Sequence, residues 1–170
     1  MERLDIYDEN RQLTGKNRLR GEKRQPGEYG LVVCVWVYDG RGNLLLTRRA
    51  PEKSFPGTWE NSGGAAQAGE DSLTAIRREL WEETGILAER SDFEYLSYSK
   101  DNSNFYDHYC LLRDVPLDQI KLLPGETDAV QWASFETMHK LIREGKVCQI
   151  IADQFLELEQ ILEDRQTAQY

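Results

Sequence analysis

Three glutamates between Gly64 and Ile86 restrict this sequence to few folds, because their spacing is that of one face of an α-helix. Glu79, Glu82 and Glu83 occupy positions i, i+3 and i+4. Carboxylates crowded in this way repel one another unless a cation lies among them. The spacing therefore predicts a helix that holds a hard divalent ion, Mg²⁺ or Mn²⁺, through oxygen ligands. Taken alone, the same spacing also fits an acidic helix face in solvent.

The residues around these glutamates favour the same helix. Leu73, Ile76 and Leu80 repeat at helical intervals and predict an apolar stripe beside the carboxylates. Acidic residues 70–71 are expected in the first turn, where negative charge complements the helix dipole, and Gly85 is expected at the C-terminal cap. The segment therefore predicts an anchored helix with defined ends.

Arg78 lies four residues before Glu82, which suits a charge-assisted pair that fixes a carboxylate rotamer. With this arginine included, residues 64–86 resemble the Nudix box, GX5EX7REUXEEXGU, without a departure. The matching residues are Gly64, Glu70, Arg78, Glu79, Leu80, Glu82, Glu83, Gly85 and Ile86. A chance match in a chain of this length is expected on the order of once in 10⁷. The chain is thus identified as similar to the Nudix, or MutT-like, hydrolases.

This resemblance implies an α/β fold, a Nudix α/β/α sandwich with a mixed sheet, and substrates in which a nucleoside diphosphate is linked to another group. It also implies roles for single residues. The implied metal ligands are Glu79, Glu82, Glu83 and a backbone carbonyl near Gly63 or Gly64, and the implied orienting residues are Glu70 and Arg78.

Diphosphate hydrolysis explains why such residues are needed. The anionic oxygens of a diphosphate repel a nucleophile, so catalysis depends on neutralising charge and positioning water. Divalent ions on the three glutamates supply both, and a remaining carboxylate acts as general base. That base is Glu83 or Glu126, with Glu83 slightly favoured. Glu126 precedes Trp132 in GETDAVQW, which resembles the distal glutamate and strand tryptophan of some family members, although an exposed loop acid is the alternative.

Basic residues before the box are candidates for holding the substrate phosphates. Arg48 and Lys53 carry the positive charge suited to this role, and both also fit a solvated surface. Trp59 lies in a segment, FPGTWENSGG, that resembles the family connection to the box. We expect it to pack in the core or a loop, with a substrate-facing role as the alternative.

The N-terminal segment LDIYDENRQLTGKNRLRG resembles the Nudix subgroup related to isopentenyl-diphosphate isomerase. Those isomerases use a cysteine just before the box, where residues 59–64 hold no thiol, and they depart from the box that this chain keeps whole. Asp107 is only a loose counterpart of their second catalytic acid. Hydrolysis is therefore preferred, with isomerase-like activity and a binding or regulatory module without turnover as alternatives.

The net charge of the chain limits the kinds of partner molecule it can bind. The net charge of −9, from 21 basic and 30 acidic residues, argues against stable nucleic-acid binding, which needs a basic surface.

Cys34, Cys110 and Cys148 form no CxxC pair, which indicates a reducing cytoplasm without disulfides or zinc. His108 and His139 are isolated and are not expected to bind metal. No apolar run approaches 18 residues, so no membrane segment is expected. A homodimer is expected from the family alone.

The chain length of 170 residues predicts one domain over 1–170, in which residues 1–28 form an N-terminal strand and arm. Alternation and turn residues predict strands over 4–7, 31–38, 44–47, 93–99, 105–113 and 129–134, and a long loop over 10–26. Helical periodicity predicts two further helices, one from Phe135 to a cap at Gly145 and one over 149–165. Together these elements predict a mixed sheet between helices.

Overall fold

The computed structural model describes residues 1–168, in which a run of strands precedes the first α-helix and two α-helices follow the last strand. The strands are β1 (Arg3–Tyr7), β2 (Leu13–Leu19), β3 (Gly30–Tyr38), β4 (Asn43–Arg49), β5 (Trp59–Glu60), β6 (Ser62–Ala65), β7 (Phe93–Lys100), β8 (Asn104–Leu112) and β9 (Thr127–Ser134). The helices are α1 (Ser72–Thr84), α2 (Phe135–Arg143) and α3 (Gln149–Thr167), with short 3-10 turns η1 (Arg90–Asp92) and η2 (Leu117–Gln119).

The main sheet is mixed, as the sequence predicted. Its order is β5-β4-β3-β8-β7, with β6 paired to β3 and β9 paired to β4. Strands β3 and β8 run parallel along their whole length, whereas the other pairs in this sheet are antiparallel. Strands β3 and β4 pair only at Tyr38 and Leu44 and then diverge, so that β6 takes the vacated edge of β3. This divergence brings Gly63 and Gly64 against the middle of β3.

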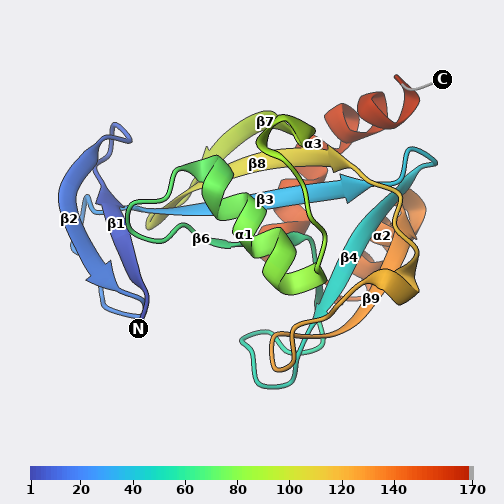
Figure 1. Cartoon of the computed structure of the whole chain (residues 1–170), viewed down its shortest axis with the longest axis horizontal. Helices are drawn as coiled ribbons and strands as arrows, with labels where there is room; N and C mark the ends of the chain where they lie inside the picture. The colour runs from blue at the N-terminus through green and yellow to red at the C-terminus, as the bar shows by residue number, and fades with distance from the viewer. Residues whose placement is uncertain (169–170) are drawn as a thin grey trace.

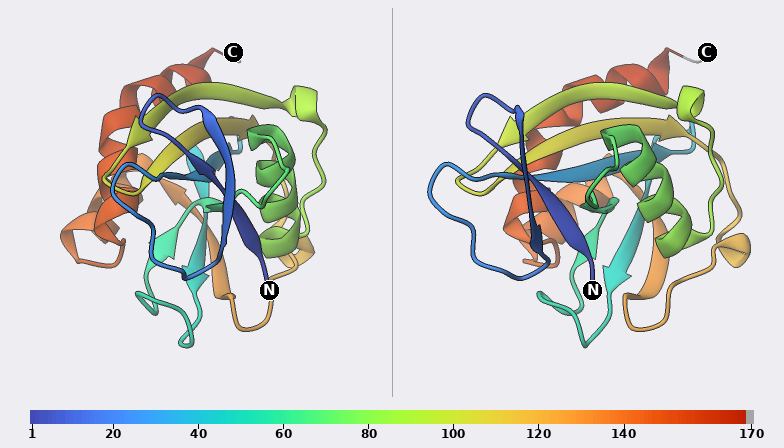
Figure 2. Two further views of the ribbon diagram at one scale, coloured as in Figure 1. Left: turned by 90° about the vertical axis from the view of Figure 1, so that its left-hand side faces the viewer. Right: turned by 60° about the vertical axis from the view of Figure 1, so that its left-hand side comes forward.

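Alternation along β3 builds a separate core on each face of the sheet. Val33, Val35 and Val37 pack with α1 on one face, and Trp36 and Tyr38 pack with α2 and α3 on the other. Figure 1 shows α1 in front of the sheet with α2 and α3 behind it, and both views of Figure 2 show the sheet between these layers. The predicted α/β/α sandwich is confirmed.

Helix α1 begins and ends on capping residues. Asp71 is the N-cap rather than a first-turn residue, and its carboxylate accepts a hydrogen bond from the Thr74 N–H at 2.8 Å. Gly85 adopts a φ of 71°, the left-handed conformation that glycine favours at a C-terminal cap. Ile76 and Leu80 are fully buried, and each such side chain contributes about 1.5–3 kcal/mol to folding. The carboxylate face of the helix is therefore rigidly placed.

The prediction of a continuous loop over 10–26 is wrong in part, because residues 13–19 form β2 and pair antiparallel with β1. Most of β2 is exposed, so no apolar alternation marks it in the sequence, and the hydrogen bonds to β1 form the strand. In Figure 2 the resulting N-terminal hairpin lies across one end of the sandwich.

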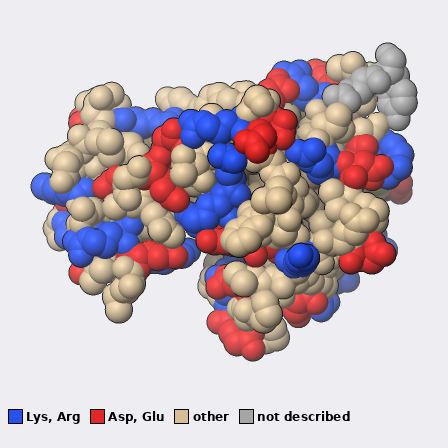
Figure 3. Space-filling view, viewed as in Figure 1, with Lys and Arg blue, Asp and Glu red and all other residues tan. Residues whose placement is uncertain are grey.

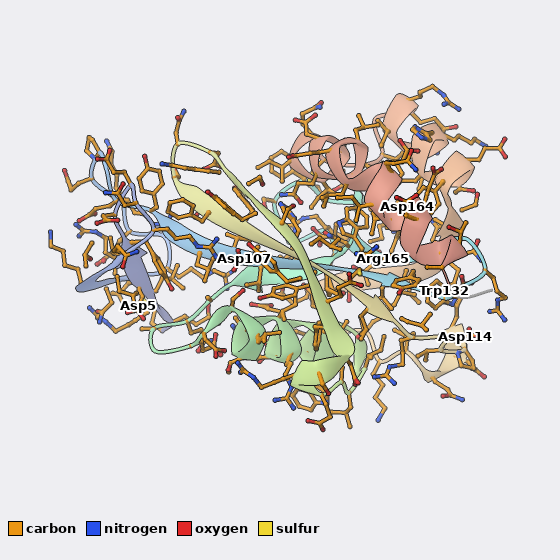
Figure 4. The ribbon with its side chains drawn as sticks, turned by 90° about the horizontal axis from the view of Figure 1, so that it is seen from above. Asp5, Asp107, Asp114, Trp132, Asp164 and Arg165 are labelled. Atoms are coloured by element: carbon orange, nitrogen blue, oxygen red, sulfur yellow. The ribbon has the colours of Figure 1, made fainter. Side chains whose placement is uncertain are left out.

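Asp107 on β8 joins this N-terminal segment to the rest of the fold. The carboxylate is almost fully buried and accepts hydrogen bonds from Arg11 Nη2 at 2.5 Å and from Ser72 Oγ at 2.6 Å. Figure 4 shows Asp107 on the strand between the N-terminal hairpin and the remaining layers. We infer that Asp107 has a structural role.

The two C-terminal helices match their predicted positions. Ser134 caps α2 by accepting a hydrogen bond from the Thr137 N–H at 3.1 Å, and Gly145, with φ of 68°, follows its C-terminal end. On α3 the predicted apolar positions Ile151, Phe155, Leu158 and Leu162 are buried. Within the described residues, no helix is long and apolar enough to cross a bilayer.

Candidate active site

A cavity of about 410 Å³ lies between the Nudix-like segment, the sheet and α3. Its walls come from the N-terminal hairpin, β3, β5, β6, α1, the loops near residues 53 and 126, β8 and the start of α3. In Figure 3 the surface is hollowed between the N-terminal hairpin at the left and the lobe at the bottom. Glu79, Glu82 and Glu83 all line this cavity, which places the predicted metal ligands on one wall.

Glu79 and Gly64 lie in direct contact. A Cβ built on Gly64 would meet the Glu79 carboxylate oxygens at 2.3 and 2.6 Å, so any larger residue there would displace the Glu79 carboxylate. Burial raises the pKa of Glu79, and the neighbouring Arg78 guanidinium acts in the opposite direction. The first residue of the box, Gly64, and the helix carboxylate of Glu79 thus form one contact surface at the cavity wall.

Arg78 is the cation that lies among the glutamates in this structure. Its guanidinium donates to both Glu70 oxygens at 2.8 and 2.9 Å, to Glu79 at 2.9 Å and to Glu82 at 3.2 Å. It also donates to the Ala65 carbonyl at 3.2 Å. The predicted pairing of Arg78 with Glu82 is present, and the bidentate bond to Glu70 fixes the plane of the guanidinium.

Glu83 is partly buried on the same wall. Its carboxylate accepts a hydrogen bond from the Gly63 N–H at 3.3 Å. Burial raises its pKa well above the ordinary value, and the negative charges of Glu60 and Glu79 add to that effect, while the Gly63 N–H and Ser62 oppose it. Such a carboxyl is suited to holding a proton or to binding a cation that offsets the crowded charge.

The donor set of this wall fits a hard divalent ion. It consists of carboxylate oxygens beside the backbone of Gly63 and Gly64, and it carries more negative charge than Arg78 neutralises. Among residues 1–168, however, no three acidic, histidine or cysteine side chains surround a common point. The sequence predicts that the glutamates converge on a metal, whereas here Glu79 and Glu82 bond to Arg78. Metal binding would therefore require these two carboxylates to turn from Arg78 toward the ion.

The two basic residues predicted to hold phosphates lie in different places. Lys53 lines the cavity and forms an ion pair with Glu126, which lines it too. Arg48 does not line the cavity, because it bonds to Asp128 at 2.7 Å and stacks over the Trp59 ring. Lys53 and the candidate base Glu126 therefore stay at the site, and the placement of Arg48 gives its predicted role no support.

Arg49 takes the place expected for Arg48. Successive residues of a strand point to opposite faces, and nothing in the Arg48-Arg49 pair indicates which one turns inward. Arg49 lines the cavity and binds both oxygens of Glu60 at 2.8 and 3.1 Å. Burial raises the pKa of Glu60, which Arg49 opposes. The sequence prediction missed this pair.

The structure also places a thiol at the site. Cys34 on β3 lies opposite Gly63 in the β3–β6 pairing and lines the cavity beside Tyr106. Burial raises the pKa of Cys34, and nearby carboxylates including Glu60 add to this, so the group is a neutral thiol. Asp107, by contrast, does not line the cavity and bonds to Arg11 and Ser72 instead.

The two tryptophans singled out in the sequence are packing residues. Trp59 is half-buried against the core that contains α2 and α3 and does not line the cavity. Trp132, labelled in Figure 4, packs against the opposite core and donates its indole N–H to the Val115 carbonyl at 3.1 Å. The expected packing role of Trp59 is confirmed.

Comparison with known proteins extends the resemblance beyond the box. The sequence model of the NUDIX domain matches residues 28–150. A Nudix hydrolase from Listeria monocytogenes is 34% identical over 148 residues, 86% of this chain and 88% of the relative. An isopentenyl-diphosphate Delta-isomerase from Pectobacterium atrosepticum is 34% identical over 140 residues, 77% of this chain and 75% of the relative. A crystal structure of a Deinococcus radiodurans protein has a TM-score of 0.78 at 25% identity, covering 92% of this chain and 98% of that one.

Proposed function

Since the chain belongs to the Nudix family of hydrolases, we propose that it cleaves the diphosphate linkage of a nucleoside diphosphate derivative with Mg²⁺ or Mn²⁺ as its cofactor. The observation that carries this proposal is the cavity wall on which Glu79, Glu82 and Glu83 lie beside Gly63 and Gly64. Carboxylate oxygens in this number suit a hard divalent ion bound to phosphate.

When bound, a divalent ion neutralises phosphate charge and lowers the pKa of a coordinated water. Glu79, Glu82 and Glu83 would hold the ion, together with a backbone carbonyl near Gly64. Arg78 orients this wall through its bidentate bond to Glu70. Its ion pairs with Glu79 and Glu82 compensate part of the negative charge of this wall.

The remaining steps fall to residues around the cavity. Glu83 accepts the proton of the attacking water at a carboxylate oxygen, and the Gly63 N–H holds that carboxylate in place. Lys53 and Arg49 present positive charge to the phosphate that leaves. Glu126 is the second candidate base, and its ion pair with Lys53 makes it less free to accept a proton.

A panel of diphosphates with and without Mg²⁺ tests this proposal. The purified chain should release a nucleoside monophosphate or inorganic phosphate from at least one nucleoside diphosphate derivative, and chelation of the metal should stop the release. Failure to hydrolyse any member at any Mg²⁺ or Mn²⁺ concentration would reject the proposal and favour a binding module.

A second candidate function is isomerisation of an isopentenyl-type diphosphate. The observation that favours it is the Cys34 thiol in the cavity, which sequence reasoning did not place there. Hydrogen exchange from deuterated water into isopentenyl diphosphate, lost in Cys34→Ala, would support isomerisation. Exchange at the uncatalysed rate would eliminate it.

We propose that the reaction takes place in a reducing cytoplasm. Cys34, Cys110 and Cys148 are all free in the structure, and burial raises the pKa of each thiol. Neutral thiols of this kind resist oxidation and are typical of a reducing compartment.

A further inference from the structure

Two side-chain amides in the cavity wall have no hydrogen-bond partner among residues 1–168. Asn61, between β5 and β6, is 3% exposed, and Gln154 on α3 is 6% exposed. Both line the cavity. The Asn61 Nδ2 and Gln154 Oε1 atoms are buried and unpaired within the described part of the chain. Asn61 thus brings an unused donor and Gln154 an unused acceptor to the same cavity.

Another buried glutamine of α3, Gln166, does have hydrogen-bond partners. It is also 6% exposed on the same helix, yet it accepts a hydrogen bond from the Gly42 N–H and donates to the Asn43 carbonyl, both at 3.2 Å. Gln166 lies outside the cavity lining and Gln154 lies within it. The unpaired amide therefore coincides with the cavity.

A buried amide without a partner destabilises a fold, because its desolvation is not repaid by a protein hydrogen bond. Gln154 also interrupts an apolar stripe, since it lies three residues after Ile151 and four before Leu158, both of them buried. An apolar side chain would satisfy the packing at this position. The retention of an amide instead indicates that its partner arrives with a ligand.

The surroundings of the two amides indicate what kind of ligand group fits. Val32, Cys34, Ile150 and Ile151 line the same cavity and offer apolar contact. The charged groups lie on α1, beside the N-terminal hairpin and around Lys53, and Glu60, the neighbour of Asn61 in the chain, is paired with Arg49. A planar, uncharged group with hydrogen-bonding edges matches amides set among such residues. Nucleobases have these edges, and carboxamides pair with them through one donor and one acceptor.

Building on the proposed function, we propose that Asn61 and Gln154 bind the base of a nucleoside diphosphate substrate while its phosphates face the α1 glutamates. The two amides then select base-bearing diphosphates over isoprenoid or other base-free diphosphates. A base-free substrate leaves both amides buried and unpaired, and sites built for hydrogen bonding discriminate strongly against such ligands.

Three variants separate this role from a structural one. Gln154→Met and Asn61→Leu remove the amide at similar volume, and Gln166→Met is the matched control on α3. The probes are ADP, GDP, CDP and UDP, with ribose 5-diphosphate as the base-free counterpart. The quantity to compare is the ratio of kcat/KM for the preferred nucleoside diphosphate to kcat/KM for ribose 5-diphosphate.

We expect this ratio to fall about three- to tenfold in Gln154→Met and in Asn61→Leu, as for loss of one hydrogen bond, and to stay unchanged in Gln166→Met. The Tm of the free protein should separate the same two glutamine variants. Gln154→Met should keep or raise the Tm of the free protein, because it removes an unpaired buried amide, whereas Gln166→Met should lower it.

An unchanged ratio in both Gln154→Met and Asn61→Leu would overturn the proposal and assign the amides to ordered water. If the wild-type chain hydrolyses none of the probes, the proposed function fails, and calorimetric titration with AMP, GMP, CMP and UMP decides the base site separately. Binding of one monophosphate that weakens at least threefold in Gln154→Met but not in Gln166→Met would support it. No binding of any of them would overturn it.

Discussion

The Glu79 carboxylate packs directly against the backbone of Gly64, so that a Cβ at position 64 would lie 2.3 Å from Glu79 Oε1. This contact joins the first residue of the Nudix-like segment to a carboxylate on its helix. It explains why a glycine is needed there for a reason other than backbone conformation, since Gly64 has no positive φ.

Gly64→Ala should therefore impair activity more than folding. The clash falls on the end of a flexible side chain, which turns away and leaves the metal-binding position. We expect kcat/KM to fall by about 100-fold or more with a Tm close to wild type. Gly63→Ala is the matched comparison, because its Cβ would meet the Val33 carbonyl at 2.3 Å in the β3–β6 pairing and should lower the Tm markedly. Equal effects of both variants on Tm would contradict this assignment.

Arg78→Lys should reduce kcat without unfolding the protein. A lysine cannot reproduce the bidentate bond to Glu70 together with the bond to the Ala65 carbonyl, so the loop before α1 loses its fixed position beside the glutamates. A loss of about 10- to 100-fold is expected in steady-state kinetics at saturating Mg²⁺. Arg77→Lys is the control, since Arg77 bonds to Ala88 and Glu89 and does not line the cavity. A loss of similar size in the control would assign the effect to the helix as a whole.

Glu83→Gln should lose more activity than Glu126→Gln if Glu83 is the base. Glu83 lies on the carboxylate wall and accepts a hydrogen bond from the Gly63 N–H, whereas Glu126 is held by Lys53. We expect a loss of about 10³-fold for Glu83→Gln and about 10-fold for Glu126→Gln, measured as kcat across pH 5 to 9. The reverse order would make Glu126 the base.

His108 should reduce stability in mild acid. Burial lowers its pKa to about 4, although Asp107 acts in the opposite direction. Because the folded state binds fewer protons than the unfolded state between that value and the unfolded pKa of about 6.5, stability falls as pH drops through this window, by up to about 3 kcal/mol. Urea unfolding at pH 7 and pH 4.5 should show a smaller difference in His108→Gln than in wild type. An NMR titration that gives His108 a pKa near 6.5 would disprove this.

The elements that the sequence predicted well are those whose pattern reflects burial or capping. The α1 helix, the buried strand β3 and the stripe of α3 were predictable because Ile76, Leu80 and Phe155 recur at intervals set by a core. Strand β2 was not predictable from the sequence, since it is mostly exposed and depends on long-range pairing with β1.

The same distinction holds at the candidate site. The α1 glutamates and Arg78 share one helix, so their proximity follows from local spacing. Arg49 and Cys34 reach the cavity through strand orientation and pairing, which one sequence does not reveal. Gln154 could have been identified from the sequence, because it is a polar residue within the buried apolar stripe of α3.

One comparison tests directly whether the α1 carboxylates bind a catalytic ion. Hydrolysis of the best diphosphate substrate in Mg²⁺ should be measured for wild type, Glu82→Gln and Glu157→Gln, the last an exposed glutamate of α3 outside the cavity lining. We predict that Glu82→Gln loses at least about 10³-fold in kcat/KM and that Glu157→Gln matches wild type. Turnover by Glu82→Gln equal to that of wild type would contradict the account.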